Sequence, residues 1–268
     1  MQLHCLAGTS LWRRNCSLVH YGTTGFSLNS SESRVISIPA SWSGRIWGRT
    51  LCSQNPTTGK FTCVTGDCGS SKIECSGAGG KPPATIAEFT LNGASNLDFF
   101  DISLVDGYNI PVTIVPYGGA AGVGKCMAAG CAADLNVVCP PQLKLTMEDT
   151  AGVAVACKSA CEAFGTPEFC CSGAFGTPDT CKASEYAGFF KKACPTAYSY
   201  AYDDGTSTFT CSGADYVITF WVGPDRIYEY LEAFVSIRSL ATLIFGDSDI
   251  RNSCGYPNYL VQIKMDNE

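Results

Sequence analysis

The number and placement of the cysteines limit what this chain can fold into. The sequence contains 17 cysteines, and the stretch GKFTCVTGDCGSSKIEC, residues 59–75, places three of them among glycines, threonines and serines. Such a density is typical of a disulfide framework or of a metal cage. The chain has no C-x-x-C pair and its only histidines are His4 and His20, which does not suit a tetrahedral metal site. We therefore expect disulfides, an oxidising compartment, and no metal ion or cofactor.

The adjacent cysteines Cys170 and Cys171 add one constraint on the pairing. A disulfide between neighbours would close a strained ring, so each of the two is expected to have a separate partner elsewhere. Disulfides of this kind hold loops together where little apolar surface is buried.

Composition and charge exclude several classes of protein. The chain has 268 residues, 46% of them hydrophobic, with 28 glycines and 13 prolines, which predicts a real core built from short strands and many turns. The net charge of −6 and the absence of a basic run exclude a nucleic-acid partner. No apolar run approaches the ~18 residues of a spanning helix, so no transmembrane segment is expected.

The N-terminal stretch MQLHCLAGTSLWRRNCSLVH lacks the apolar region and the small-residue cleavage site of a signal peptide. Because a disulfide-rich protein should enter the secretory route, we expect that the authentic N-terminus differs from this one.

Alternating apolar and polar residues predict strands. The pattern occurs in SRVISIPASW (33–42), GRIWGRT (44–50), ATIAEFTL (84–91) and STFTCSGADYVITF (207–220). The segment LDFFDISLVDGYNIPVTIVPYG (97–118) predicts two strands joined at Asp106 and Gly107, a turn pair. Residues 52–84 are expected to be looped and cross-linked.

Two segments predict helices. TPDTCKASEYAGFFKKAC (177–194) gathers Tyr186, Phe189 and Phe190 on one helical face and places two lysines in the last turn, where cations suit the helix dipole. The segment YEYLEAFVSIRSLATLIF (228–245) has the pattern of an amphipathic helix.

Carboxylates are the main candidates for acid–base chemistry. The body of the chain has no histidine, and oxidised cysteines are not nucleophiles, so the Ser-His-Asp and Cys-His schemes are excluded. A pair of carboxylates is what glycoside hydrolysis needs, one to protonate the leaving oxygen and one to attack or to activate water.

One motif resembles the signature of the plant thaumatin-like proteins, pathogenesis-related family 5, which includes osmotin and zeamatin. The signature reads G-x-[GF]-x-C-x-T-[GA]-D-C followed by a further Cys, and it is filled by Gly59, Phe61, Cys63, Thr65, Gly66, Asp67, Cys68 and Cys75. SGRIWGRT, IAEF, DISLVDGYNIP, CAADLN and FFKKACPTAYSYAYDD resemble further family segments in the family's order. The resemblance covers residues 22–220.

The resemblance implies a mainly β fold, a flattened antiparallel β-sandwich with disulfide-rich loop regions and a short helix. A small disulfide loop region (54–86) and a disulfide-rich helical region (132–194) would flank an acidic cleft. Residues 1–21 and 221–268 depart from the family pattern and are expected to be an atypical N-terminal segment and an atypical C-terminal extension.

The family connectivity implies seven disulfides: Cys52–Cys63, Cys68–Cys75, Cys126–Cys211, Cys131–Cys194, Cys139–Cys157, Cys161–Cys170 and Cys171–Cys181. Cys5, Cys16 and Cys254 are left over. Either Cys254 pairs with Cys16 or Cys5, or both ends come from a misjoined gene model.

The resemblance also implies the residues of the acidic cleft, which by position are Arg45, Glu88, Asp101, Asp106 and Asp204. We expect Glu88 to act as the acid and Asp101 as the base or nucleophile. Plainer interpretations stay open: Asp106 is part of a turn, and Arg45 is a surface strand residue or a structural ion-pair partner. Asp203 and Asp204 are then solvated loop charges, and the choice of Asp204 for the cleft rests on the resemblance. Asp67 is expected to be a hydrogen-bonding residue within its loop.

By the same resemblance, the protein is expected to be a secreted, antifungal defence protein that binds β-1,3-glucan of fungal cell walls as a monomer. The apoplast and the vacuole are the expected locations, and Asn29 in NSS is a candidate glycan site. One alternative is a weak endo-β-1,3-glucanase acting on the same polymer, and another is a non-functional truncated paralogue.

Overall fold

The computed structural model describes residues 24–28, 33–39, 41–120, 123–150, 152–221, 233–235 and 258–266. The predictions for Asn29, for the leftover cysteines Cys5, Cys16 and Cys254, and for residues 1–21 fall outside these residues.

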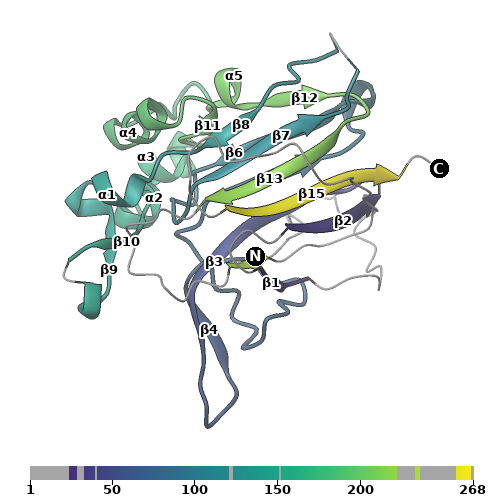
Figure 1. Ribbon diagram of the computed structural model, residues 1–268. Helices are drawn as coiled ribbons and strands as arrows, with labels where there is room; N and C mark the ends of the chain where they lie inside the picture. Colours follow the sequence, from purple (N-terminus) through teal and green to yellow (C-terminus); the bar gives the residue numbers. More distant parts are fainter. Residues whose placement is uncertain are drawn as a thin grey trace.

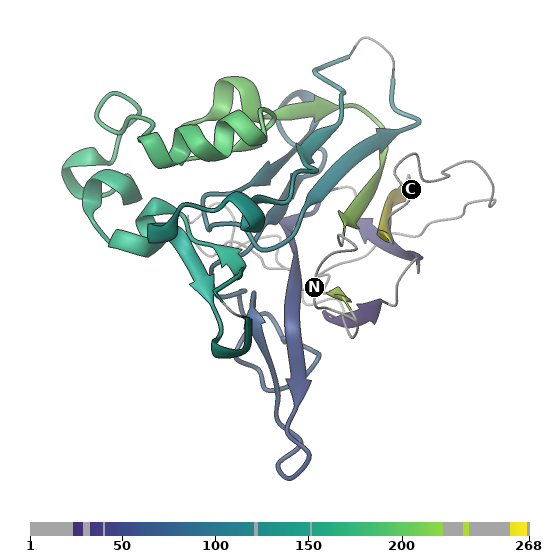
Figure 2. The same ribbon diagram turned by 60° about the vertical axis from the view of Figure 1, so that its left-hand side comes forward.

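The larger of two main sheets has eight strands and carries the functional residues discussed below. Its strand order is β1-β14-β3-β5-β6-β11, with β4 paired to β3 and β12 paired to β6. The long strand β3 continues into a β3–β4 hairpin that extends away from the rest of the molecule (Figures 1 and 2). The strands are β1 (Phe26–Leu28), β14 (Ala233–Val235), β3 (Ser43–Gln54), β4 (Phe61–Thr65), β5 (Ile86–Thr90), β6 (Asp98–Ser103), β11 (Ala197–Tyr198) and β12 (Phe209–Cys211).

The second main sheet has five strands in the order β2-β15-β13-β7-β8. It is visible in Figure 1 as a layer of nearly aligned strands through the middle of the molecule. The strands are β2 (Ser33–Pro39), β15 (Asn258–Asp266), β13 (Asp215–Trp221), β7 (Val112–Tyr117) and β8 (Ala129–Cys131).

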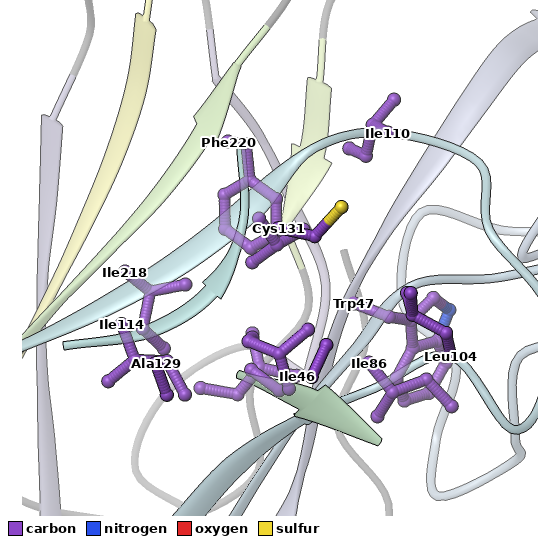
Figure 3. Close-up of a cluster of buried hydrophobic side chains, with 14 of the residues drawn as sticks. Ile46, Trp47, Ile86, Leu104, Ile110, Ile114, Ala129, Cys131, Ile218 and Phe220 are labelled. Carbon is purple, nitrogen blue, oxygen red and sulfur yellow. The ribbon is translucent and has the colours of Figure 1, made fainter. Parts of the chain in front are cut away.

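The two sheets pack into a sandwich whose inner faces form the core. The alternation in ATIAEFTL acts as predicted, because Ala87, Phe89 and Leu91 are all buried. The ring of Phe89 meets Tyr216 of the other sheet at 5.3 Å between centroids, and Phe100 meets the same tyrosine at 5.1 Å. Figure 3 shows another part of this core, which includes Ile46 and Ile86 of the eight-stranded sheet and Ile114 and Phe220 of the five-stranded sheet. The predicted mainly β sandwich is thus confirmed.

Short helices and a two-stranded sheet form a flanking region on one side of the sandwich (Figure 2). The helix predicted from TPDTCKASEYAGFFKKAC is confirmed as α4 (Glu185–Ala193): Ser184 caps it by accepting from the Ala187 amide, and its buried face includes Phe190. The other elements are α1 (Leu135–Val138), α2 (Ala160–Phe164), α3 (Pro167–Cys170), α5 (Asp204–Ser207), β9 (Lys144–Thr146) and β10 (Ala154–Cys157).

The structure corrects two local expectations and confirms a third. Within the predicted helix 228–245, residues Ala233–Val235 form strand β14 between β1 and β3, so the helix is wrong there. The two strands predicted on either side of Asp106 and Gly107 are confirmed as β6 and β7, and they belong to different sheets. Residues 52–84 are not all loop, since they include the end of β3 and all of β4.

Two strand pairs also depart from the antiparallel pattern. The β2–β15 pair and the β6–β11 pair are parallel.

Seven disulfides connect the described residues. They are Cys52–Cys63, Cys68–Cys75, Cys126–Cys211, Cys131–Cys194, Cys139–Cys157, Cys161–Cys170 and Cys171–Cys181, the same pairs that the family connectivity implies. The neighbours Cys170 and Cys171 have separate partners. Five of the seven bonds lie wholly within residues 52–75 or 139–181, regions made of loops and short elements.

A buried hydrogen bond between the two sheets gives the first testable prediction. The Tyr216 hydroxyl donates to Asp98 Oδ2 at 2.8 Å, and both residues are almost fully buried. Tyr216→Phe leaves that carboxyl oxygen without its donor, so we expect the free energy of unfolding to fall by about 1–2 kcal/mol. Denaturant unfolding measures it, with Tyr200→Phe as the control. An unchanged midpoint for Tyr216→Phe would show that the bond contributes nothing.

Candidate functional site

The centre of the candidate site is a row of three charged side chains across neighbouring strands. Arg45 on β3 lies opposite Glu88 on β5, and Glu88 lies opposite Asp101 on β6. The next residues along these strands, Ile46, Ala87 and Ile102, are completely buried. Because side chains alternate between the faces of a sheet, the charged row lies on the face opposite these core residues.

Arg45 connects this row to the turn at the end of β6. Its Nε donates to Glu88 Oε1 at 2.5 Å, and its Nη1 lies 3.5 Å from Asp106 Oδ2. The side chains of Arg45 and Glu88 are 26% and 23% exposed, so the pair is partly shielded from water. From the sequence, Asp106 was either a turn residue or a residue of the acidic cleft, and in the structure it is both part of a turn and a partner of Arg45. It precedes Gly107, which has a φ of +83°, and it pairs with the arginine.

Tyr198 continues the row on the far side of Asp101. Strand β11 runs parallel to β6 with Tyr198 opposite Ser103, which places Tyr198 and Asp101 on the same face of the sheet. The Tyr198 hydroxyl donates to Asp204 Oδ1 at 2.9 Å and shares a hydrogen bond with Thr208 Oγ1 at 2.5 Å. Burial raises the pKa of Tyr198, and the negative charges of Asp101 and Asp204 raise it further. Tyr198 is a site residue that the sequence analysis missed.

The adjacent aspartates Asp203 and Asp204 have different environments. Asp203 Oδ2 lies 2.9 Å from Lys191 Nζ and accepts from both the amide and the hydroxyl of Ser199. Burial alone would raise the Asp203 pKa, but these hydrogen bonds and the lysine charge lower it. Asp204 instead bonds to Tyr198 and interacts electrostatically with Asp101. Asp204 is therefore the one that joins the charged row, and Asp203 fixes its loop to α4.

The two carboxyl groups at the centre have raised pKa values. Burial raises the pKa of Asp101 well above its usual range, and the nearby charges of Glu88 and Asp204 raise it further. Asp101 Oδ2 is buried and accepts no hydrogen bond from the described residues. Burial also raises the pKa of Glu88, against the opposing charge and hydrogen bond of Arg45. The geometry therefore favours a proton on Asp101 beside an ionised Glu88.

We call the group of Arg45, Glu88, Asp101, Asp106 and Asp204 the acidic site. It combines hydrogen-bond acceptors with a carboxyl group that tends to hold a proton, which suits the binding of neutral hydroxylated molecules and general acid–base chemistry. No metal-binding group of three or more His, Cys, Asp or Glu side chains occurs among the residues described. In the same part of the chain, no helix is long and apolar enough to cross a membrane.

Asp67 of the cysteine-rich motif has a structural role, as predicted. Its carboxylate accepts from the Cys63 amide at 2.7 Å and from the Gly69 amide at 2.7 Å. These bonds hold the loop between Cys63 and Cys68 and leave Asp67 outside the acidic site.

Comparison with known proteins identifies close similarity to one family. The sequence profile of the Thaumatin family matches residues 9–222. Thaumatin-like protein 1 of Arabidopsis thaliana is 56% identical over 204 residues, which cover 74% of this chain and 75% of that protein. Pathogenesis-related protein 5 of the same plant is 53% identical over 199 residues, covering 74% and 79%.

A third relative is larger. The PR5-like receptor kinase of Arabidopsis thaliana is 51% identical over 200 residues, which cover 74% of this chain but 30% of the kinase. The similarity therefore concerns one part of that protein.

The raised pKa of Asp101 predicts a pH-dependent cost to folding. The folded protein holds this proton more tightly than the unfolded chain, whose aspartates titrate at about 3.9. The stability that protonated Asp101 contributes is fully present below the unfolded-state pKa. It is lost as the pH rises through the pKa of Asp101 in the folded protein. Asp101→Asn removes a carboxyl group that on folding must either take up a proton or be buried as a charge, so we expect the free energy of unfolding to increase by roughly 1–3 kcal/mol at pH 7 and by less at pH 4.

Denaturant unfolding at both pH values measures this effect, and the exposed Asp179 supplies the matched control, Asp179→Asn. A variant at Asp101 that is less stable than the wild type at pH 7 would show that the ionised carboxylate is well satisfied.

Proposed function

This chain belongs to the Thaumatin family, and on that premise we propose that it is a defence protein that binds β-1,3-glucan of fungal cell walls at the acidic site. The name of a relative, pathogenesis-related protein 5, supports the defence role. The choice of glucan follows from the family resemblance together with the chemistry of the site.

The observation that carries the proposal is the charged row across β3, β5 and β6. Neighbouring strands lie about 4.8 Å apart, so the row offers polar groups at short, regular intervals on a rigid sheet. Carboxylate oxygens accept hydrogen bonds from sugar hydroxyls, and Arg45 donates to sugar oxygens. A neutral polysaccharide is not repelled by the excess of carboxylates, as a phosphate or an acidic polymer would be.

Slow hydrolysis of the same polymer is the second candidate function. The observation that favours it is the pair of neighbouring carboxyl groups with unequal environments. From the sequence we expected Glu88 to be the acid and Asp101 the base or nucleophile. The ion pair with Arg45 favours the ionised form of Glu88, so in a hydrolytic mechanism we assign the proton-donating role to Asp101 and the base or nucleophile role to Glu88.

We further propose that the protein is secreted, to the apoplast or the vacuole, and acts as a monomer. Seven disulfides need an oxidising compartment to form and persist. No cofactor is needed for binding or for carboxylate-based hydrolysis.

Glucan binding and glucan hydrolysis are separated by one set of variants. The oxidised protein, Glu88→Gln, Asp101→Asn and the control Asp179→Asn are mixed with insoluble β-1,3-glucan, and both the bound fraction and the released reducing sugar are measured. For a binding protein, we expect sedimentation with the polymer, no sugar release, and affinities in Glu88→Gln and Asp101→Asn reduced by about ten-fold or less. For an enzyme, sugar release falls by at least about a hundred-fold in both variants.

Two other outcomes are informative. A monodisperse, oxidised protein that neither binds nor cleaves the polymer would contradict both functions. Failure to obtain such a protein would instead favour the non-functional paralogue.

A further inference from the structure

Helix α2 begins directly against the turn that carries Asp106. Tyr108 and Cys157 exchange two backbone hydrogen bonds, each 2.7 Å long. Gly107 precedes Tyr108, and a Cβ atom on it would lie 2.8 Å from the Cys157 carbonyl oxygen and 3.2 Å from the Ser159 amide nitrogen. Only glycine permits this approach at a positive φ. The start of α2 is therefore fixed beside the acidic site.

Glu162 lies in the first turn of α2, and its carboxyl group is unusual. Ser159 caps the helix by accepting from the Glu162 amide at 3.2 Å. A glutamate at this position commonly completes a capping box by accepting from the amide of the capping residue. Here neither carboxyl oxygen takes part in a hydrogen bond with the described residues, and Oε2 is buried. The usual capping role therefore does not account for this side chain.

The charges around Glu162 connect it to the acidic site. Burial raises its pKa to about 7, with Lys158 lowering the value and Asp106 raising it. Lys158 precedes the helix, and Asp106 belongs to the adjoining turn. Of the elements that pack against α2, α3 contributes the exposed Glu168, and the 3-10 turn Pro141–Leu143 contributes no titratable side chain. Asp106 is thus the carboxylate that couples Glu162 to the arginine and to the row beyond it.

A second observation sets Glu162 apart from the other acidic residues. In the described part of the chain, two carboxyl oxygens are buried without a hydrogen-bond partner, Asp101 Oδ2 and Glu162 Oε2. Such atoms are costly unless the group is neutral or a ligand completes its bonding. Asp101 belongs to the acidic site, and Glu162 is an electrostatic neighbour of Asp106, another residue of that site.

We propose that Glu162 is a further ligand-binding residue of this site, which in its protonated form donates a hydrogen bond to a hydroxyl oxygen of the glucan on the α2 side of Asp106. The inference rests on the proposed glucan binding and extends the site from the sheet onto the helical region. The neutral carboxyl donates through its O–H. The ionised carboxylate cannot donate to that oxygen, can only accept from the hydroxyl group, and also repels Asp106. Binding through Glu162 should therefore weaken as the pH rises through about 7.

The test compares Glu162→Gln, Glu162→Ala and the control Glu168→Gln, an exposed glutamate on the neighbouring helix. Affinity for a soluble β-1,3-gluco-oligosaccharide is measured by calorimetry at pH 5.5 and pH 8.5. One neutral hydrogen bond corresponds to roughly a five-fold change in affinity. We expect Glu162→Ala to bind about five-fold more weakly than the wild type at pH 5.5.

Glu162→Gln should keep the wild-type affinity at pH 5.5, because its amide also donates. Between pH 5.5 and pH 8.5 the affinity of the wild type should fall by roughly five-fold more than the affinity of Glu162→Gln. A purely structural role for Glu162 would not produce this difference in pH dependence. Glu168→Gln should follow the wild type at both values.

The outcomes separate this inference from the proposed function. If the wild type binds the oligosaccharide and both Glu162 variants match it at both pH values, the role of Glu162 is overturned and glucan binding stands. If the folded wild type binds no β-1,3-glucan, glucan binding itself fails and the inference fails with it. Glu162→Gln, which preserves shape and the helix cap, carries the test if Glu162→Ala does not fold.

Discussion

The backbone register of β3, β5 and β6 is the constraint on which the acidic site depends. That register brings Arg45, Glu88 and Asp101 opposite one another and, one residue further along, aligns Ile46, Ala87 and Ile102 in the core. A slip of one residue would exchange the two sets and bury the charges. The cost of such a slip means that packing of the core, rather than any attraction among the charged groups, holds the carboxylates together.

The rest of the site depends on segments that the sheet does not fix. Asp106, Asp204 and Glu162 lie in a turn and in short helices, which are marginal on their own. Covalent and ionic links hold these segments. Cys139–Cys157 secures the strand before α2, Cys131–Cys194 ties the end of α4 to β8, and the Lys191–Asp203 pair joins α4 to the loop that carries Asp204. The cysteine density that dominates the sequence thus serves the geometry of the site as well as stability.

The sequence predicted the elements whose signal is local. The alternation of 84–91 gave β5, and the capped amphipathic pattern before Cys194 gave α4. The signal failed where long-range pairing decided the outcome. The pattern of 228–245 suits a helix, yet at Ala233–Val235 the backbone pairs with β1 and β3. Tyr198 was missed because a tyrosine among several tyrosines has no distinctive local pattern. Its role arises only from the parallel pairing of β11 with β6.

The charge distribution of the site favours a neutral ligand over an ionic one. Arg45 is already paired with Glu88 and approaches Asp106, so it has little net charge to offer an anion. A cation would meet carboxyl groups whose pKa values burial raises, which disfavours their charged forms. Buried acceptors without donors, such as Asp101 Oδ2, reduce stability in the unbound protein, and a hydroxyl group can supply the missing hydrogen bond without bringing a charge. This match between unsatisfied carboxyl groups and a polyhydroxylated chain is the strongest physical reason to look for a polysaccharide as the partner.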